Sequence, residues 1–507
     1  MKILQRHLAA RIERALGVSW VVNIVGPRQA GKTTLVRDLI DTAFYATLDD
    51  DAVRGTLETD AYGQLLLLSE QTKNSGRPIV LDEVQRLPQI TLALKRLVDA
   101  DRRSGQYVLT GSSDIFTTAA AYDSLAGRVM TLTLRPFSVA EIVGNGPCAL
   151  LDAVSHHSAD CLDQLPKPGG LTRAQAINLI VRGGFPEIRD LSDPDRMDCY
   201  RSYLDSIVER DVAPVVRIRK PGVLRRLMDQ LAACAAEEIG VATLCQMLGA
   251  RKETVSDDID ILSRLGIVYR LGAWTSSGAK REIKAPKLHF LDTGCATALR
   301  GEGAGSFGLG ADPTALGHLL ESFALTELEK SLPFLSKRWR LYHWRLDARE
   351  IHIVAEAPEK LLALFEVKAA STVVAQDFRH IDWFRNEGPG RDYRATGFVV
   401  YLGSQLLSFG LRMTLPLVDV LVVPSRMSRG RSLDRLQAPL TGPYHSRPIA
   451  GRCGRRRVIP GGRRAGSRPE NPYPPPPCRA FRRLTGVISR GPRGNVLSVS
   501  LRQPRGQ

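Results

Sequence analysis

The chain has 507 residues, well above the roughly 100–200 of a typical single domain, so several domains are expected. No run reaches the about 18 apolar residues that cross a bilayer, and the eight cysteines form no C-x-x-C pair, which argues against membrane-spanning, zinc and disulfide-framework proteins. The formal charge of +17 lies in residues 425–507, which contain 19 arginines, no lysine and two acids, so the preceding residues are neutral. Basic charge therefore does not mark the folded part as a nucleic-acid binder.

The first 17 residues, "MKILQRHLAARIERALG", have no uninterrupted apolar core and no cleavage site, so an ordinary soluble helix and a cytoplasmic location are expected. Next, "WVVNIV" predicts a β-strand, and residues 32–40 predict a helix. Between them Gly26, Gly31, Lys32 and Thr33 match G-x-x-x-x-G-K-[ST]. In that pattern glycines let backbone N–H groups surround phosphates, lysine reaches the β/γ oxygens and threonine holds Mg²⁺. ATP and Mg²⁺ are therefore the expected cofactors, with Thr34 beside them.

The next strands predict the remaining parts of a hydrolase. "RPIVLDEVQRL" ends an apolar strand in Asp82, which would orient Mg²⁺, and Glu83, which would activate the attacking water. "GQYVLTGSSDI" ends a further strand with Thr110 and Ser112, where a hydroxyl would hydrogen-bond the γ-phosphate or the water. Arg128, before the strand "VMTLTL", is either an arginine finger or a helix cap.

Together the P-loop, Asp82, Glu83, Thr110 and "SLAGR" resemble a bacterial and archaeal group of AAA-family ATPases, over most of residues 1–424. "LDD" at 48–50, "GGFPE" at 183–187 and "VERDV" at 208–212 continue the resemblance. It implies a Mg²⁺-dependent ATPase, with Thr110 corresponding to sensor 1.

A linker with His156 and His157, for which a metal site is not expected, leads to helices from Leu171 onward. "VATLCQMLGARKETVSDDIDILSRLGIVYRL" then resembles a winged helix. Acidic residues on its second helix would repel phosphates, so packing or protein interaction is favoured over DNA binding. Five basic residues of the predicted wing could still contact a nucleic-acid backbone: Arg270, Lys280, Arg281, Lys284 and Lys287. The expected apolar faces comprise Leu244, Met247, Leu248, Val255, Ile259, Ile261, Leu262 and Leu265.

The third part resembles the restriction-endonuclease-like fold. A helix carrying Glu321 and Glu327 precedes three strand-like runs, "WRLYHW", "EIHIVAEA" and "LLALFEVKAAS". The last run holds Glu366 and Lys368 in the family's E-x-K pattern. The preceding run reads Glu350, Ile351, His352, whereas the family pattern has an aspartate at the third position. Because Mg²⁺ prefers oxygen ligands, a degenerate nuclease site is expected unless Glu350, Asp347 or Glu321 compensates.

The predicted fold class is α/β. Residues 1–145 form an AAA-type P-loop ATPase domain, 146–220 a linker and helical lid, 221–300 a winged-helix-like domain, 301–424 a restriction-endonuclease-like domain, and 425–507 a disordered Arg/Pro/Gly-rich tail. The expected function is ATP hydrolysis coupled to an unidentified protein partner, with homo-oligomerisation and nucleic-acid contact through wing or tail left open. The two alternatives are an ATP-gated DNA or RNA nuclease and a nucleotide-switched scaffold without enzymatic activity.

Overall fold

The computed structural model describes residues 3–111, 125–155, 172–209, 221–277, 281, 285–308, 313–409 and 411–417. All of them belong to the first of two compact units, Met1–Gly442 and Pro443–Gln507. Within these described ranges no helix is both long and apolar enough to cross a membrane.

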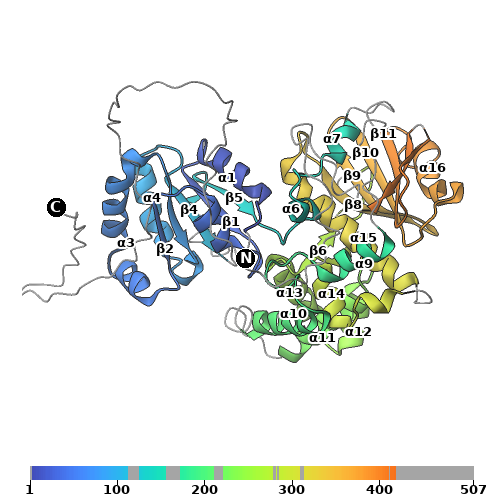
Figure 1. Cartoon of the computed structure of the whole chain (residues 1–507), viewed down its shortest axis with the longest axis horizontal. Helices are drawn as coiled ribbons and strands as arrows, with labels where there is room; N and C mark the ends of the chain where they lie inside the picture. Colours follow the sequence, from blue (N-terminus) through green and yellow to red (C-terminus); the bar gives the residue numbers. More distant parts are fainter. Residues whose placement is uncertain are drawn as a thin grey trace, which may run out of the picture. The chain divides into compact units, whose positions relative to one another are not determined.

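The N-terminal part is a parallel sheet of five strands in the order β2-β3-β4-β1-β5 (Figure 1). Its strands are β1 (Val21–Val25), β2 (Phe44–Thr47), β3 (Ile79–Asp82), β4 (Tyr107–Gly111) and β5 (Val129–Thr133). Its helices are α1 (His7–Leu16), α2 (Lys32–Thr34), α3 (Asp51–Thr72) and α4 (Ile90–Ala100). The next two helices, α6 (Val139–Val143) and α7 (Leu150–Ser155), pack instead in the core of the middle and C-terminal parts (Figure 1). A π-helical turn, Leu35–Leu39, continues α2.

Both faces of this sheet are covered, because successive residues of a strand point to opposite sides. Val80 and Val108 pack in one core with Leu8 and Ile12 of α1 and with Leu35 after α2. Their strand neighbours pack in a second core with α3 and α4, and include Ile79, Leu81, Tyr107 and Leu109. The near-continuous apolar runs in the sequence therefore correspond to strands buried on both sides.

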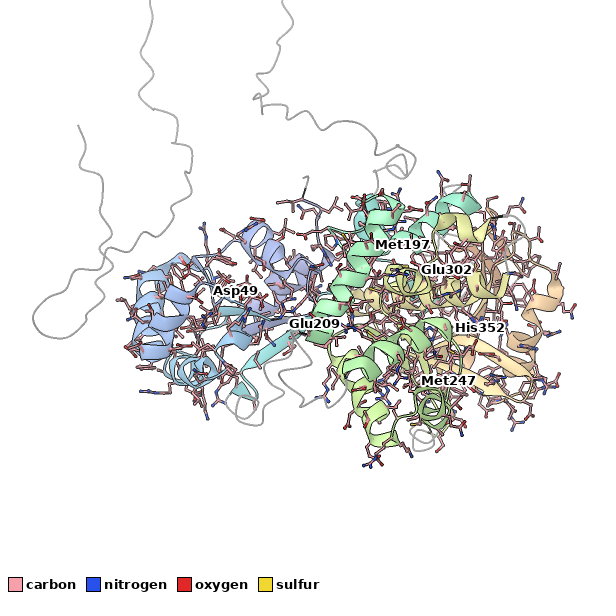
Figure 2. The ribbon with its side chains drawn as sticks, turned by 90° about the horizontal axis from the view of Figure 1, so that it is seen from below. Asp49, Met197, Glu209, Met247, Glu302 and His352 are labelled. Carbon is pink, nitrogen blue, oxygen red and sulfur yellow. The ribbon has the colours of Figure 1, made fainter. Side chains whose placement is uncertain are left out.

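The middle part is mainly helical. It contains α9 (Arg173–Arg182), α10 (Asp193–Ile207), α11 (Pro221–Ala233), α12 (Val241–Leu248), α13 (Lys252–Arg264), α14 (Thr293–Arg300) and the antiparallel pair β6 (Val268–Leu271) and β7 (Lys287–Phe290). The expected order of helix, helix and strand over residues 241–271 is observed. Met247 was wrongly assigned to the apolar face, since Leu244 and Leu248 form the buried stripe of α12 and Met247 is 51% exposed (Figure 2).

The C-terminal part is a six-stranded sheet in the order β12-β13-β11-β10-β9-β8. The expected runs form β8 (Arg340–Leu346), β9 (Arg349–Ala357) and β10 (Leu361–Lys368), followed by β11 (Arg394–Tyr401), β12 (Leu407–Ser408) and β13 (Arg412–Pro416). Helix α15 (Pro313–Ser331) shares a core with Leu361, Ala363 and Phe365. Helix α16 (Arg379–Asn386) shares a different core with the intervening Leu362 and Leu364, so β10 is buried on both faces.

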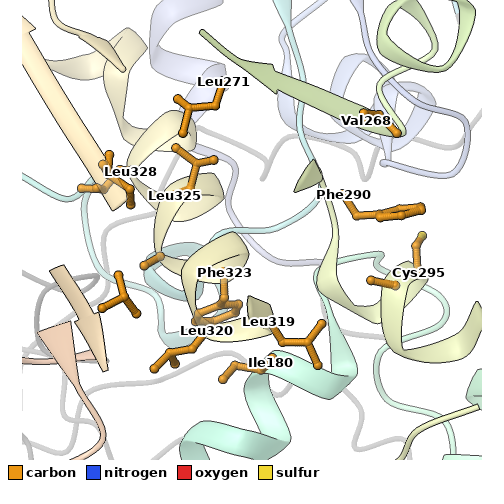
Figure 3. Close-up of a cluster of buried hydrophobic side chains, with 14 of the residues drawn as sticks. Ile180, Val268, Leu271, Phe290, Cys295, Leu319, Leu320, Phe323, Leu325 and Leu328 are labelled. Atoms are coloured by element: carbon orange, nitrogen blue, oxygen red, sulfur yellow. The ribbon is translucent and has the colours of Figure 1, made fainter. Parts of the chain in front are cut away.

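One hydrophobic core extends through the middle and C-terminal parts. Figure 3 shows Leu271 of β6 and Phe290 of β7 in the same buried cluster as Leu319, Leu320 and Leu325 of α15. The β6–β7 pair of the middle part therefore packs directly against the C-terminal part.

Candidate functional site

The loop from Gly26 to Gly31, between β1 and α2, has backbone angles that favour glycine. Gly26 has φ 154°, and a Cβ there would lie 2.1 Å from the carbonyl oxygen of Leu134. Gly31 has φ 93°. The ammonium of Lys32 lies inside the loop and donates to the carbonyls of Gly26 and Pro27, both at 2.9 Å. The loop is thus compact and lined by backbone, as a phosphate cradle requires.

Asp82, the last residue of β3, is the centre of a hydrogen-bond network at the carboxyl edge of the sheet. The Thr33 hydroxyl donates to its Oδ2 at 2.9 Å, and the Tyr45 hydroxyl donates to the same oxygen at 2.8 Å. Thr110 donates to Oδ1. Burial, together with the Asp82 carboxylate, raises the pKa of the Tyr45 hydroxyl, so it stays a donor. Thr33 and Asp82 both carry oxygen atoms that could act as ligands of Mg²⁺, and these side chains lie within hydrogen-bond distance of each other.

Glu83 follows Asp82 with a left-handed backbone at φ 58°, a conformation that costs a residue with a side chain about 1–3 kcal/mol. Its N–H donates to the Thr110 hydroxyl at 3.3 Å, and its carboxylate accepts from the Gln85 side chain. Neither Tyr45 nor Gln85 belongs to a motif that could be recognised in the sequence. Thr34, the neighbour of Thr33 in α2, is half-buried.

Arg128 does not lie at this edge. The parallel register pairs Val21 with Val129 and Val25 with Thr133, so Arg128 precedes β5 at the amino-terminal edge of the sheet. Five strand residues, about 16 Å at 3.3 Å each, separate the two edges. Its guanidinium binds Asp99 at 2.7 and 3.1 Å. The prediction that Arg128 acts as an arginine finger is therefore wrong for the nucleotide site of its own chain.

Residues from three separate segments contact the P-loop. The buried guanidinium of Arg6, before α1, donates to the Ala30 carbonyl at 3.0 Å and to the Arg135 carbonyl, and it pairs with Glu141 at 3.2 Å. A Cβ on Gly31 would lie 3.7 Å from Pro186, in the "GGFPE" segment. A Cβ on Gly266, after α13, would lie 3.2 Å from Pro27. The middle part thus borders the phosphate loop directly.

A second polar cluster lies in the C-terminal part and brings together the five predicted nuclease-type residues. Glu321 of α15 and Glu350 of β9 both bind the ammonium of Lys287 from β7, Glu321 at 3.0 Å. Lys287 is 3% exposed and Glu321 5% exposed. Both carboxylates hold the pKa of Lys287 above its usual value despite burial, and Lys287 holds the pKa of Glu350 below its usual value. Lys287 is therefore buried, and the prediction that it lies on a wing free to contact a nucleic-acid backbone is wrong.

The remaining members, His352, Glu366 and Lys368, complete this cluster (His352 in Figure 2). His352 Nε2 lies 3.9 Å from Glu321 Oε2 and 3.8 Å from Glu366 Oε1. Lys368 donates to Glu366 Oε1 at 2.8 Å, whereas Glu366 Oε2 is buried and accepts no hydrogen bond from the described part of the chain. Burial raises the pKa of Glu366.

Asp347 lies exposed in the β8–β9 turn and does not join the cluster. Glu327, six residues after Glu321, instead accepts from the Val139 N–H at 2.9 Å and from Lys330 at 2.7 Å. Among the described residues no group of three or more His, Cys, Asp or Glu side chains is arranged to hold a metal ion.

Other basic wing residues are also paired with acids. Arg270 binds Asp260, and Arg281 binds Glu356 at 2.6 and 2.9 Å. Lys280 and Lys284 lie outside the described residues, as do Ser112, His156, His157, the end of "VERDV" and residues 425–507.

Comparison with family models divides the chain into three matched segments. A model described as "AAA domain" matches residues 19–143. Two domains of unknown function, DUF8612 and DUF4143, match residues 173–306 and 316–420. The matches thus follow the N-terminal, middle and C-terminal parts.

Two uncharacterised mycobacterial proteins are similar over most of the chain. Rv2008c of Mycobacterium tuberculosis is 30% identical over 376 residues, which cover 73% of this chain and 75% of that protein. Mb2031c of Mycobacterium bovis matches with the same identity and coverage. Among solved structures, a Walker-type ATPase of Pyrococcus abyssi is 14% identical with a TM-score of 0.35, covering 59% of this chain and 96% of that chain.

Proposed function

Because this chain belongs to the same family as Rv2008c of Mycobacterium tuberculosis and its residues 19–143 match an AAA-domain model, we propose that it hydrolyses ATP with Mg²⁺ and couples hydrolysis to a protein partner. The observation that carries the proposal is the hydrogen bond between Thr33 and Asp82 beside a compact P-loop, with Glu83 next in sequence. These residues come from β3 and from the loop and helix after β1, and the fold brings them to one edge of the parallel sheet. Oxygen donors for a cation and a carboxylate for a water molecule lie there side by side.

The P-loop and Asp82 are assigned to binding. The loop N–H groups and the Lys32 ammonium would hold the β- and γ-phosphates. Thr33 and Asp82 would hold Mg²⁺, Asp82 through water molecules. When bound, the cation neutralises the charge that develops on the phosphate oxygens.

Glu83 is assigned as the general base. Its carboxylate would orient a water molecule and accept its proton, which typically contributes about 10²–10⁴-fold to a rate. Gln85, which donates to that carboxylate, and Thr110, which accepts from the Glu83 N–H, fix its position.

Coupling is assigned to the contacts between the P-loop and the middle part. Pro186 and Gly266 border Gly31 and Pro27, so a change in loop shape on nucleotide binding would displace the segments after α9 and α13. Because residues 1–424 carry no net charge and the middle part's Arg270 and Arg281 are paired with acids, a protein partner is favoured over nucleic acid.

Nucleotide titration of purified full-length variants tests the site. Lys32→Ala should lose ATP affinity, because β/γ-phosphate charge is left uncompensated, whereas Glu83→Gln should bind ATP as the wild type does. Equal affinity in wild type and Lys32→Ala would refute the assignment of the loop. ATP-loaded Glu83→Gln recovered from cells would then identify the partner. A protein that binds ATP normally but never turns it over would instead support the scaffold alternative.

A further inference from the structure

The second polar cluster, in the C-terminal part, contains the buried ammonium of Lys287. The ammonium of Lys287 bridges Glu321 and Glu350, two of the three carboxylates that a nuclease-type site would offer to a metal. Lys287 comes from β7, outside the β8–β10 segment that carries the other strand residues. A positively charged group thus already occupies the position between the two carboxylates.

We propose that Lys287 takes the place of a divalent metal in the cluster of Glu321, Glu350 and Glu366, so that this site neither binds Mg²⁺ nor cleaves phosphodiesters. This inference goes beyond the ATPase proposal and does not depend on it. It also gives the cluster a role, which is to attach β7 to α15 and β9 by two ionic contacts of one buried ammonium.

His352 does not offer a metal ligand in this arrangement. Its Nδ1 accepts the N–H of Val367 at 3.0 Å, which uses the lone pair of that nitrogen. A ring nitrogen that accepts an N–H carries no proton, so the single ring proton lies on Nε2, which faces Glu321 and Glu366. With Nδ1 committed and Nε2 protonated, neither nitrogen has a lone pair directed at the cluster.

Lys287 is fixed in place by the backbone around it. β7 pairs with β6, and the chain after β6 is bonded to β8: the His343 N–H donates to Gly272 at 3.0 Å and the Trp274 N–H donates to the His343 carbonyl at 2.6 Å. Trp274 is fully buried and contacts Phe384 of α16 with ring centroids 5.2 Å apart. The strand that carries Lys287 is therefore held in place by backbone hydrogen bonds and by a packed core.

Glu366 is the third carboxylate of the cluster in which Lys287 takes the place of a metal ion. One of its oxygens accepts from Lys368, and the other is buried and accepts no hydrogen bond from any described residue. With Lys287 changed to a neutral side chain, the charge of Glu321 and Glu350 is left uncompensated, and we expect side-chain movements to bring these carboxylates and this oxygen around a divalent cation, which their present arrangement does not hold.

The experiment is a Mn²⁺ titration of the full-length chain without nucleotide, in an Asp82→Asn background that silences the P-loop site, with free Mn²⁺ measured by electron paramagnetic resonance. The parent and its Glu366→Gln derivative should bind Mn²⁺ equally weakly. Adding Lys287→Met should tighten binding by about tenfold or more, and adding Glu366→Gln to that variant should abolish the gain.

Two results would overturn the proposal: Mn²⁺ binding by the parent that Glu366→Gln removes, or no tightening in a folded Lys287→Met variant. Circular dichroism monitors folding of each variant. If Lys287→Met does not fold, the comparison between the parent and Glu366→Gln still decides, together with Mn²⁺-dependent plasmid nicking by the otherwise unmodified chain, which should be absent. Nicking that Glu366→Gln abolishes would establish a working nuclease instead.

Discussion

Arg6→Gln should loosen the P-loop although Arg6 precedes the loop by 20 residues. The substitution removes the donor to the Ala30 carbonyl and leaves Glu141, 7% exposed, without its cation. Breaking one partner of a buried ion pair costs about 3–5 kcal/mol. Glu141 keeps hydrogen bonds from the N–H groups of His7 at 2.8 Å and Ser138 at 3.0 Å, so we expect the lower end, about 3 kcal/mol.

Hydrogen-exchange mass spectrometry measures this effect locally, which suits a chain of several parts that need not unfold in one step. A loss of about 3 kcal/mol in opening free energy corresponds to roughly 100-fold faster exchange in a peptide covering the P-loop and the Leu35 amide, since each 1.4 kcal/mol is tenfold. The matched control is Arg14→Gln, an exposed arginine of α1, the helix that follows Arg6, for which a change within about 0.5 kcal/mol is expected. Indistinguishable P-loop exchange in the two variants would refute the role given to Arg6.

Gly266→Ala should weaken ATP binding, because its methyl group would lie 3.2 Å from Pro27 of the P-loop. The control, Gly249→Ala, has a similar positive φ but nothing within 4 Å, so it should lose only about 1–2 kcal/mol of stability. Equal ATP affinities in the two variants would argue against coupling through the contact with Pro27. Stability of the α12–α13 region should rise on acidification, because burial, with a smaller contribution from Asp257, raises the pKa of Asp258 to about 6. A carboxyl whose folded-state pKa is raised contributes stability below its unfolded value that is lost as pH rises through about 6, so wild type should lose urea resistance between pH 5 and 7.5 relative to Asp258→Asn. Parallel pH profiles would show that Asp258 titrates normally.

The candidate ATPase residues at the carboxyl edge of the N-terminal sheet could be predicted because the sequence patterns that mark them are local. The glycines, Lys32 and Thr33 lie within one turn between a strand and a helix, and Asp82 and Glu83 end an apolar run. In a parallel sheet the carboxyl ends of neighbouring strands meet, so these separate segments converge without further information. Arg128 lies away from the nucleotide site of its own chain because it precedes β5, and a residue that precedes a strand of this sheet lies at the amino-terminal edge.

Long-range ion pairs could not be predicted. Arg6 and Glu141 are separated by 135 positions, and Lys287 and Glu350 by 63, and neither pair has a periodic or spacing signal. Lys287 was read as a surface residue because lysines are rarely buried unless paired, and its carboxylate partners belong to other elements. Only the packing of β7 against α15 and β9 brings these charges together.

Phosphate release from ATP by the purified full-length chain in Mg²⁺ tests the central claim most directly. We predict steady turnover by the wild type, a loss of about 10²–10⁴-fold in Glu83→Gln at unchanged ATP affinity, and no release when Mg²⁺ is chelated. Wild-type turnover that persists in Glu83→Gln, or no turnover at all by a chain that binds ATP, would contradict the account.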